Sequence, residues 1–231
     1  MLLAFPLLTV ALLAACGASR DKTSSGVTPT PNAQPASPAT PVETLPKIVA
    51  FGDSLTAGYG LSPTESYPAL LQKLLDADGF KYEVVNAGIS GDTSAGGVRR
   101  IDWSLDAGNV RFVILELGAN DFLRGQPVAE TRKNLSQIIA RAKSRGVRVL
   151  LAGMLTTSEH GRGYESEISE AFQSLAKEQE VTLIPFFLEN VAGRDELNQQ
   201  DRVHPNAEGT RIVAATVYRY LKPMLEQEQK K

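Results

Sequence analysis

The sequence has 231 residues, and its 24 lysines and arginines are nearly balanced by 26 acidic residues, which leaves a formal net charge of −2. Nucleic-acid binding normally requires a clustered positive surface, and this chain has no dominant basic stripe, so its composition argues against a nucleic-acid partner. Once an apolar N-terminus and a proline-rich stretch are set aside, roughly 185 residues remain, which is the size of one domain with a single core.

The first 16 residues form an apolar run that closes with Leu13-Ala14-Ala15-Cys16. At about 15 residues this run is shorter than a membrane-spanning helix and has the length of the apolar part of a secretory signal. Leu-Ala-Ala-Cys followed by Gly17 is similar to the bacterial lipobox, and this similarity implies that the Cys16 thiol is lipidated. No Lys or Arg precedes the run, which departs from the basic start of such signals. The alternative is that Cys16 is only a small apolar residue of a cleaved signal.

Residues 17–45 contain repeated prolines among Ser, Thr and Ala. A segment of this composition cannot bury enough apolar surface to offset the entropy of ordering it, and its prolines favour an extended chain. We therefore divide the chain into a signal peptide with its lipobox cysteine (1–16), a disordered tether (17–45), a folded domain (46–225) and a charged C-terminal tail (226–231).

Five short apolar runs predict β-strands at 47–51, 82–86, 111–117, 147–152 and 181–185. Each run is nearly continuous rather than alternating, which is typical of strands that are buried on both faces of a sheet.

Amphipathic segments between and after these runs predict helices at 67–75, 128–144, 165–180 and 207–221. In the second of them, Leu135, Ile138, Ile139 and Ala142 recur at the spacing of one helix face. Strands that alternate with helices pair in parallel through right-handed crossovers. The predicted fold class is therefore α/β, a three-layer α/β/α sandwich with a parallel, five-stranded, flavodoxin-like sheet.

Residues that can carry chemistry follow the ends of the predicted strands. Gly52-Asp53-Ser54 follows the first strand, residues 86–93 end the second and continue beyond it, residues 118–121 follow the third, and residues 201–205 precede the last helix. Because ligands of an open parallel sheet bind outside the carboxyl ends of its strands, we expect these segments to meet at one edge.

A serine and a histidine in these segments suggest nucleophilic catalysis. Gly52 permits a sharp turn that presents the Ser54 hydroxyl outward, although Gly-Asp-Ser is also ordinary turn chemistry. A serine nucleophile needs a base, and the chain has only two histidines, His204 and a second one, His160, in an expected loop. The alternative is that His-Pro-Asn at residues 204–206 merely starts the last helix.

An acid lies close to this histidine in the sequence. Asp201 precedes His204 by three residues, a spacing that can bring its carboxylate to the imidazole Nδ1 and fix the tautomer of the ring. The alternative is a surface acid that pairs with Arg202 or caps the turn.

The four segments closely resemble the sequence blocks of the SGNH (GDSL) hydrolases. Within that family they are most similar to the bacterial branch of periplasmic thioesterases, lysophospholipases and arylesterases, and the likeness covers about residues 47–223. The resemblance implies that Ser54 is the nucleophile, His204 the base and Asp201 the acid of a catalytic triad.

The same resemblance implies an oxyanion hole. Its donors would be the backbone N–H groups of Ser54 and Gly88 and the side-chain amide of Asn120. A turn glycine and a loop cap are the structural alternatives for Gly88 and Asn120.

Three acids, Asp53, Asp92 and Asp121, are expected near this edge and raise the question of a metal site. No His or Cys accompanies them as a soft ligand, and carboxylates beside a loop glycine more often hold the loop. The resemblance implies an enzyme that needs neither a metal nor another cofactor.

Two segments leave the acyl-chain preference open. Relatives usually carry prolines and an Asn-Tyr-Gly-like turn in the loop that corresponds to residues 153–164, and this chain keeps little of that pattern beyond Gly163-Tyr164. The apolar segment 186–197 either walls the acyl pocket or packs inside the domain.

We therefore expect a serine esterase that hydrolyses carboxylic ester or thioester bonds through an acyl-enzyme intermediate. Its expected substrates are small acyl esters, acyl thioesters or lysophospholipids. We expect a monomer that is lipid-anchored in the bacterial cell envelope and faces the periplasm or the cell exterior. The alternatives are a carbohydrate O-acetyl esterase of the envelope and a non-catalytic binding lipoprotein that kept the scaffold.

Overall fold

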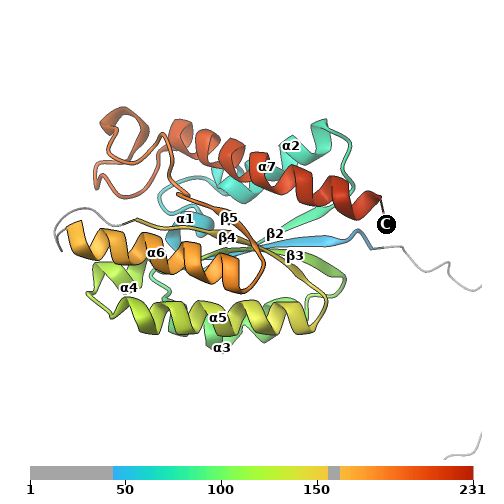
Figure 1. The fold of residues 1–231 in the computed structure, drawn as a ribbon. Helices are drawn as coiled ribbons and strands as arrows, with labels where there is room; N and C mark the ends of the chain where they lie inside the picture. The colour runs from blue at the N-terminus through green and yellow to red at the C-terminus, as the bar shows by residue number, and fades with distance from the viewer. Residues whose placement is uncertain (1–43, 156–161, 231) are drawn as a thin grey trace, which may run out of the picture. The chain divides into compact units, whose positions relative to one another are not determined.

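Five parallel strands form the central sheet of the computed structural model, which describes residues 44–155 and 162–230 (Figure 1). The strands lie in the order β2-β1-β3-β4-β5, and their bounds are β1 Lys47–Gly52, β2 Glu83–Gly88, β3 Val110–Glu116, β4 Arg148–Ala152 and β5 Thr182–Ile184. The predicted α/β fold with a parallel flavodoxin-like sheet is confirmed. The expected signal peptide with Cys16, all but the last two residues of the expected tether, and His160 lie outside the described residues.

The strand order places a topological switch at β1, because the chain moves from β1 to one side, at β2, and then returns to the other side, at β3. Gly52 at the end of β1 pairs with Gly88 on β2 and with Glu116 on β3, so the three strands end at the same level. Ligands of such sheets bind outside the carboxyl ends of the strands at the switch. We therefore expect the ligand site at the loops that follow these three strands.

Helices cover both faces of the sheet, which gives the predicted three layers (Figure 1). Helices α2 (Tyr67–Ala77) and α7 (Ala207–Gln229) pack together on one face. Helices α3 (Ser94–Leu105), α5 (Val128–Ser144) and α6 (Arg162–Glu178) lie on the other. The predicted apolar stripe of α5 is buried against the core, and its members are Leu135, Ile138, Ile139 and Ala142. Two short helices, α1 (Ser54–Ala57) and α4 (Ala119–Leu123), begin at or near the ends of β1 and β3.

Two expectations about the elements are wrong. Strand β2 is an edge strand whose Glu83 and Asn86 are exposed, so it is not buried on both faces. Helix α3 is absent from the predicted elements, and Gly96 and Gly97 near its start are residues that disfavour helix. Gly97 allows close packing against the core, since a Cβ there would lie 2.4 Å from a methyl group of Leu117.

Helix α7 extends to Gln229, so residues 226–229 belong to the folded domain rather than to a separate charged tail. Its Glu228 forms an ion pair with Arg111 of β3, which ties this end of the helix to the sheet. Within the described residues, no helix has the length and apolar composition needed to span a membrane.

Candidate active site

The turn after β1 presents Ser54 as the first residue of helix α1. Asp53 caps this helix, because its Oδ1 accepts the Leu55 N–H at 3.0 Å. Gly52 has no room for a side chain, since a Cβ would lie 2.1 Å from Thr56 Oγ1. The chain therefore turns tightly from the strand into the helix and leaves the Ser54 hydroxyl beyond the end of the sheet.

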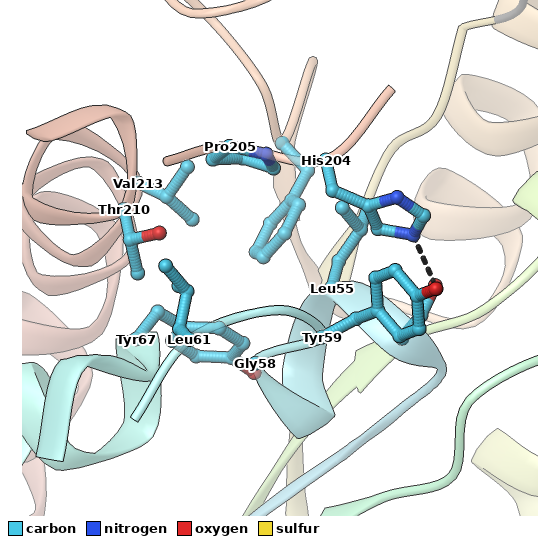
Figure 2. Close-up of a pocket in the computed structure, with 11 residues that line it drawn as sticks. Leu55, Gly58, Tyr59, Leu61, Tyr67, His204, Pro205, Thr210 and Val213 are labelled. Atoms are coloured by element: carbon cyan, nitrogen blue, oxygen red, sulfur yellow. Dashed lines mark hydrogen bonds between the residues drawn. The ribbon is translucent and has the colours of Figure 1, made fainter. Parts of the chain in front are cut away.

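The structure brings Ser54, His204 and Asp201 together, although Ser54 and His204 lie 150 residues apart. The contact of the His204 ring with the Ser54 hydroxyl is the dashed line in Figure 2. Ser54 Oγ lies 2.9 Å from Nε2 of His204, and Nδ1 of the same ring lies 2.7 Å from Asp201 Oδ2. Because Asp201 can only accept, the geometry favours the tautomer with its proton on Nδ1. Nε2 then accepts the hydrogen bond of the Ser54 hydroxyl.

The acid is held by the backbone of its own turn. Asp201 Oδ1 accepts the N–H groups of Val203 and His204, each at 3.0 Å. Arg202, which lies between Asp201 and Val203, has a positive φ of 59°. Partial burial raises the pKa of Asp201, but the hydrogen bonds from His204 and Val203 outweigh it and lower the pKa to about 2. Arg202 pairs with Asp195, so the alternative of an Asp201–Arg202 pair is wrong.

His204 lies just before the start of α7, so the His-Pro-Asn sequence also starts a helix. The Asn206 side chain caps α7 by accepting the N–H groups of Glu208 and Gly209. The helix start and the presentation of the imidazole are therefore compatible.

Two residues that the sequence did not single out hold this histidine segment against the serine segment. Gln199 Nε2 donates to the carbonyl oxygens of Tyr59, at 2.7 Å, and Pro205, at 3.0 Å. The Tyr59 ring packs against the imidazole of His204 with a centroid distance of 4.7 Å (Figure 2). No local pattern marks either residue, because their partners lie far away in the sequence.

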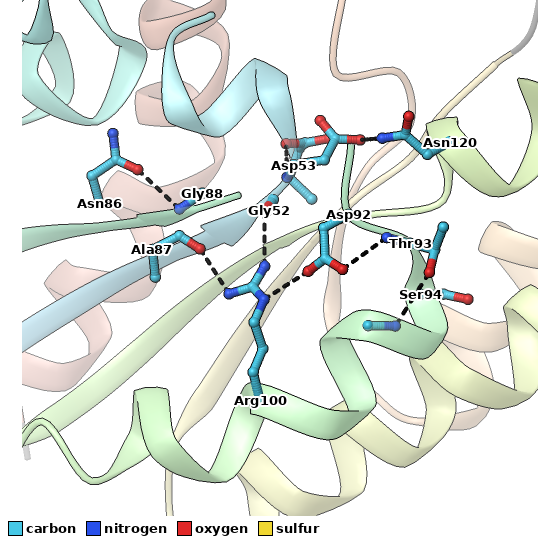
Figure 3. A network of polar contacts seen from close by, with 12 residues as sticks. Gly52, Asp53, Asn86, Ala87, Gly88, Asp92, Thr93, Ser94, Arg100 and Asn120 are labelled. Atoms are coloured by element: carbon cyan, nitrogen blue, oxygen red, sulfur yellow. Dashed lines mark hydrogen bonds and ion pairs between the residues drawn. The ribbon is translucent and has the colours of Figure 1, made fainter. Parts of the chain in front are cut away.

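Asn120 occupies the position expected of an oxyanion donor, on helix α4 just after β3. Its Nδ2 donates one hydrogen bond to Asp53 Oδ2 at 2.9 Å (Figure 3). An amide nitrogen carries two protons, so this contact orients the group and leaves a second N–H for a ligand.

Gly88 does not fit the role expected of it. Its N–H already donates to Asn86 Oδ1 at 3.0 Å (Figure 3), and a Cβ on Gly88 would lie 2.2 Å from the Ala57 backbone nitrogen. Glycine is therefore needed there to let the end of β2 pack against α1. Gly91, three residues further along the loop, has a positive φ of 79°, and its N–H has no acceptor among the described residues.

The three acids once considered for a metal site hold loops instead. Asp92 pairs with Arg100 at 2.7 Å, and the same guanidinium donates to the carbonyl oxygens of Gly52 and Ala87, each at 2.8 Å (Figure 3). Arg100 thereby ties the ends of β1 and β2 to the loop that carries Gly91. Asp121 accepts the Ser94 N–H and hydroxyl, and Asp53 caps α1. Across residues 44–155 and 162–230, no three His, Cys, Asp or Glu side chains are grouped to hold a metal ion.

An apolar groove of about 400 Å³ lies beside the triad. Its lining comes from the segments that carry Ser54, Asn120 and His204 and from the segments that follow β4 and β5. The apolar members include Leu55, Ala119, Phe122, Leu123, Met154, Leu155, Phe186, Leu188 and Val203, and the charged members are Glu165 and Arg202. Segment 186–197 does both of the things considered for it, because Phe186 and Leu188 line the groove whereas Phe187 is buried against Tyr67.

Comparisons with known proteins agree with this geometry. The model of the GDSL-like Lipase/Acylhydrolase family matches residues 50–212. Esterase TesA of Pseudomonas aeruginosa is 38% identical over 178 residues, which cover 77% of this chain and 89% of the relative. Thioesterase 1/protease 1/lysophospholipase L1 of Escherichia coli is 37% identical over 181 residues, or 78% of this chain and 86% of the relative.

Solved structures give the same result. The crystal structure of TesA superposes with a TM-score of 0.75 at 38% identity, over 77% of this chain and 98% of the other. The psychrotrophic esterase EstA from Pseudoalteromonas sp., inhibited by monoethylphosphonate, superposes with a TM-score of 0.74 at 32% identity, over 78% and 98%. Sequence blocks, fold and strand-end geometry thus lead to one conclusion: this chain belongs to the GDSL-like lipase/acylhydrolase family, the SGNH hydrolases.

Proposed function

We propose that this chain is a serine esterase that hydrolyses acyl esters and thioesters with Ser54, His204 and Asp201 as its catalytic triad. The observation that carries the proposal is the unbroken chain of short contacts from Ser54 Oγ through the His204 ring to Asp201. A serine hydroxyl is a weak nucleophile unless a base accepts its proton, and this geometry supplies that base.

The mechanism follows from these contacts. Ser54 Oγ attacks the carbonyl carbon while His204 Nε2 takes its proton, and the adjacent Asp201 carboxylate stabilises the imidazolium. His204 then returns the proton to the leaving alcohol or thiol, which leaves an acyl group on Ser54. A water molecule, deprotonated by His204, attacks this acyl-enzyme, and the acid is released as Ser54 recovers its proton.

The negative oxygen of each tetrahedral intermediate needs preorganised donors. We assign this role to the second N–H of the Asn120 amide and to the backbone N–H groups of Ser54 and Gly91. Gly91 replaces Gly88 in this assignment because no described residue accepts the Gly91 N–H, whereas the N–H of Gly88 is engaged by Asn86.

The groove supports a substrate with an apolar acyl chain. Its lining is mostly aliphatic and aromatic, and Leu123, Leu155 and Val203 are exposed at its wall. A volume of about 400 Å³ exceeds what an acetyl group fills and suits a longer chain. We therefore favour acyl esters, acyl thioesters and lysophospholipids over O-acetylated sugars.

The first prediction concerns the nucleophile. Ser54→Ala should lower kcat/KM for p-nitrophenyl butyrate by at least about 10³-fold, because no other group takes over the covalent step. Ser174→Ala on the exposed face of α6 is the control and should leave the rate unchanged. A Ser54→Ala enzyme with undiminished activity would refute the assignment.

The second prediction separates the two candidate glycine donors and tests the amide donor. Asn120→Ala should lower kcat by about 10² to 10³, since it removes one oxyanion donor. Asn86→Ala frees the Gly88 N–H without touching Asn120 or Gly91, so it should change kcat less than about threefold. A large rise of kcat in Asn86→Ala would return the oxyanion role to Gly88.

The third prediction concerns chain length. Leu123→Asp places a charge in the groove and should reduce kcat/KM for p-nitrophenyl octanoate at least about tenfold, because buried methylene groups contribute roughly 0.8 kcal/mol each. Hydrolysis of the acetate ester, which needs little of the groove, is the internal control. Equal losses on both esters would show that the acyl chain lies elsewhere.

We also propose that Cys16 carries a lipid that anchors the enzyme in the bacterial cell envelope, facing the periplasm or the exterior. The support is the lipobox-like sequence that ends at Cys16. Mass spectrometry of the native N-terminus should find a chain that begins with acylated Cys16. An unmodified cysteine, or a mature N-terminus beyond residue 16, would contradict the anchor.

A further inference from the structure

Glu116, the last residue of β3, lies directly beneath the serine turn and is completely buried. Its Oε2 accepts the Thr56 hydroxyl at 2.6 Å and the Asp53 backbone N–H at 3.2 Å. These two donors come from the residue before Ser54 and from the second residue after it. One carboxyl group on the central strand therefore accepts hydrogen bonds from the turn on both sides of the nucleophile.

Asp53 is the second buried acid at this place, with 1% of its surface exposed. One of its oxygens accepts the Leu55 N–H at 3.0 Å. The other accepts the Asn120 amide at 2.9 Å (Figure 3). Glu116 is its immediate neighbour, because Glu116 Oε2 accepts the Asp53 backbone N–H. We call these two residues the carboxyl pair.

The carboxyl pair must hold a proton. Neither acid forms an ion pair with Lys or Arg within residues 44–155 and 162–230, and Oε1 of Glu116 meets no N–H or O–H donor there. Two buried carboxylates this close together, without a cation, are strongly unfavourable, so one of the two groups holds a proton.

The proton belongs on Glu116. Burial raises the pKa of Asp53 to about 6, and hydrogen bonds from Leu55 and Asn120 together with the charge of His204 oppose that rise. Burial, followed by the neighbouring Asp53 charge, holds the pKa of Glu116 well above its usual range. Of the two acids, Glu116 is therefore the one that holds the proton, and Asp53 is the carboxylate.

We propose that Glu116 is a positioning residue that acts as a neutral carboxylic acid. Its proton bridges to the Asp53 carboxylate, which in turn orients the Asn120 amide, while Oε2 fixes the turn that carries Ser54. The proposal rests on the roles proposed for Ser54 and Asn120. It deepens them, because one shared proton links the placement of the nucleophile to the placement of an oxyanion donor.

The neutral acid has a consequence for folding. Because the folded chain binds the Glu116 proton more tightly than the unfolded chain, the neutral acid stabilises the fold at low pH, and this stability is lost as the pH rises through the raised pKa of Glu116. The other titratable groups that act on the pair are His204, through Asp53, and the buried Tyr67, whose hydroxyl lies 3.4 Å from Thr56 Oγ1.

A matched pair of variants tests the positioning role. Glu116→Gln keeps a donor toward Asp53 and an acceptor for Thr56, so its kcat should stay within about threefold of the wild-type value. Glu116→Met keeps the size but neither function, and should lower kcat by about 10²-fold with little change in KM, because the nucleophile and the amide lose their alignment. Equal losses in Glu116→Gln and Glu116→Met would overturn the proposal.

The shared proton is tested without activity, in the Ser54→Ala background. Infrared spectra at pH 7 should show the carbonyl stretch of a buried protonated acid, and Glu116→Gln should abolish it. The pH dependence of unfolding should show that Glu116→Gln takes up one proton fewer on folding. An absent band, or one that persists in Glu116→Gln, would overturn the proposal even if Glu116→Met does not fold. These results are independent of the proposed function, which fails instead if Ser54→Ala remains active.

Discussion

The register between β1 and its two neighbours is the constraint on which this site depends. Gly52 pairs with Gly88 on one side and with Glu116 on the other, so three strands stop at one level and their loops open on one edge. The parallel backbone hydrogen bonds between these strands fix that level. Ser54 follows β1 and Asn120 follows β3, and both inherit their positions from this register. His204 reaches the same edge from the start of α7.

The site uses carboxyl groups in opposite electrical states. Asp201 is partly exposed and accepts several hydrogen bonds, so its pKa falls to about 2 and it is ionised beside His204. Asp53 and Glu116 are buried under the serine turn, and burial raises the pKa of both. The number of hydrogen bonds that each carboxylate accepts and its exposure to solvent, rather than its residue type, therefore decide which acid carries charge. A charged acid suits the imidazolium that forms during catalysis, whereas a neutral acid suits a place that must be held rigidly.

Much of this could be predicted from the sequence, because continuous apolar runs mark buried strands and the residues that follow them have few alternative positions in a parallel sheet. The edge position of β2 could not be predicted from the sequence, because tertiary structure decides which strands pair with each other. Which glycine donates to the oxyanion, Gly88 or Gly91, depends on where its N–H points, and that direction depends on the conformation of the loop. The role of Gln199 could not be predicted either, because its side chain joins the serine and histidine segments through a hydrogen bond to Tyr59, which lies far away in the sequence. Glu116 follows an apolar run, and only the structure shows that its side chain turns under Ser54.

The most direct test of the account is the identity of the residue that an active-site phosphonate modifies. Peptide mass spectrometry after treatment with a fluorophosphonate should place a single covalent adduct on Ser54, and His204→Ala should slow its formation by orders of magnitude because the hydroxyl loses its base. An adduct on another residue, or labelling of Ser54 at an unchanged rate in His204→Ala, would contradict a nucleophile activated by that imidazole.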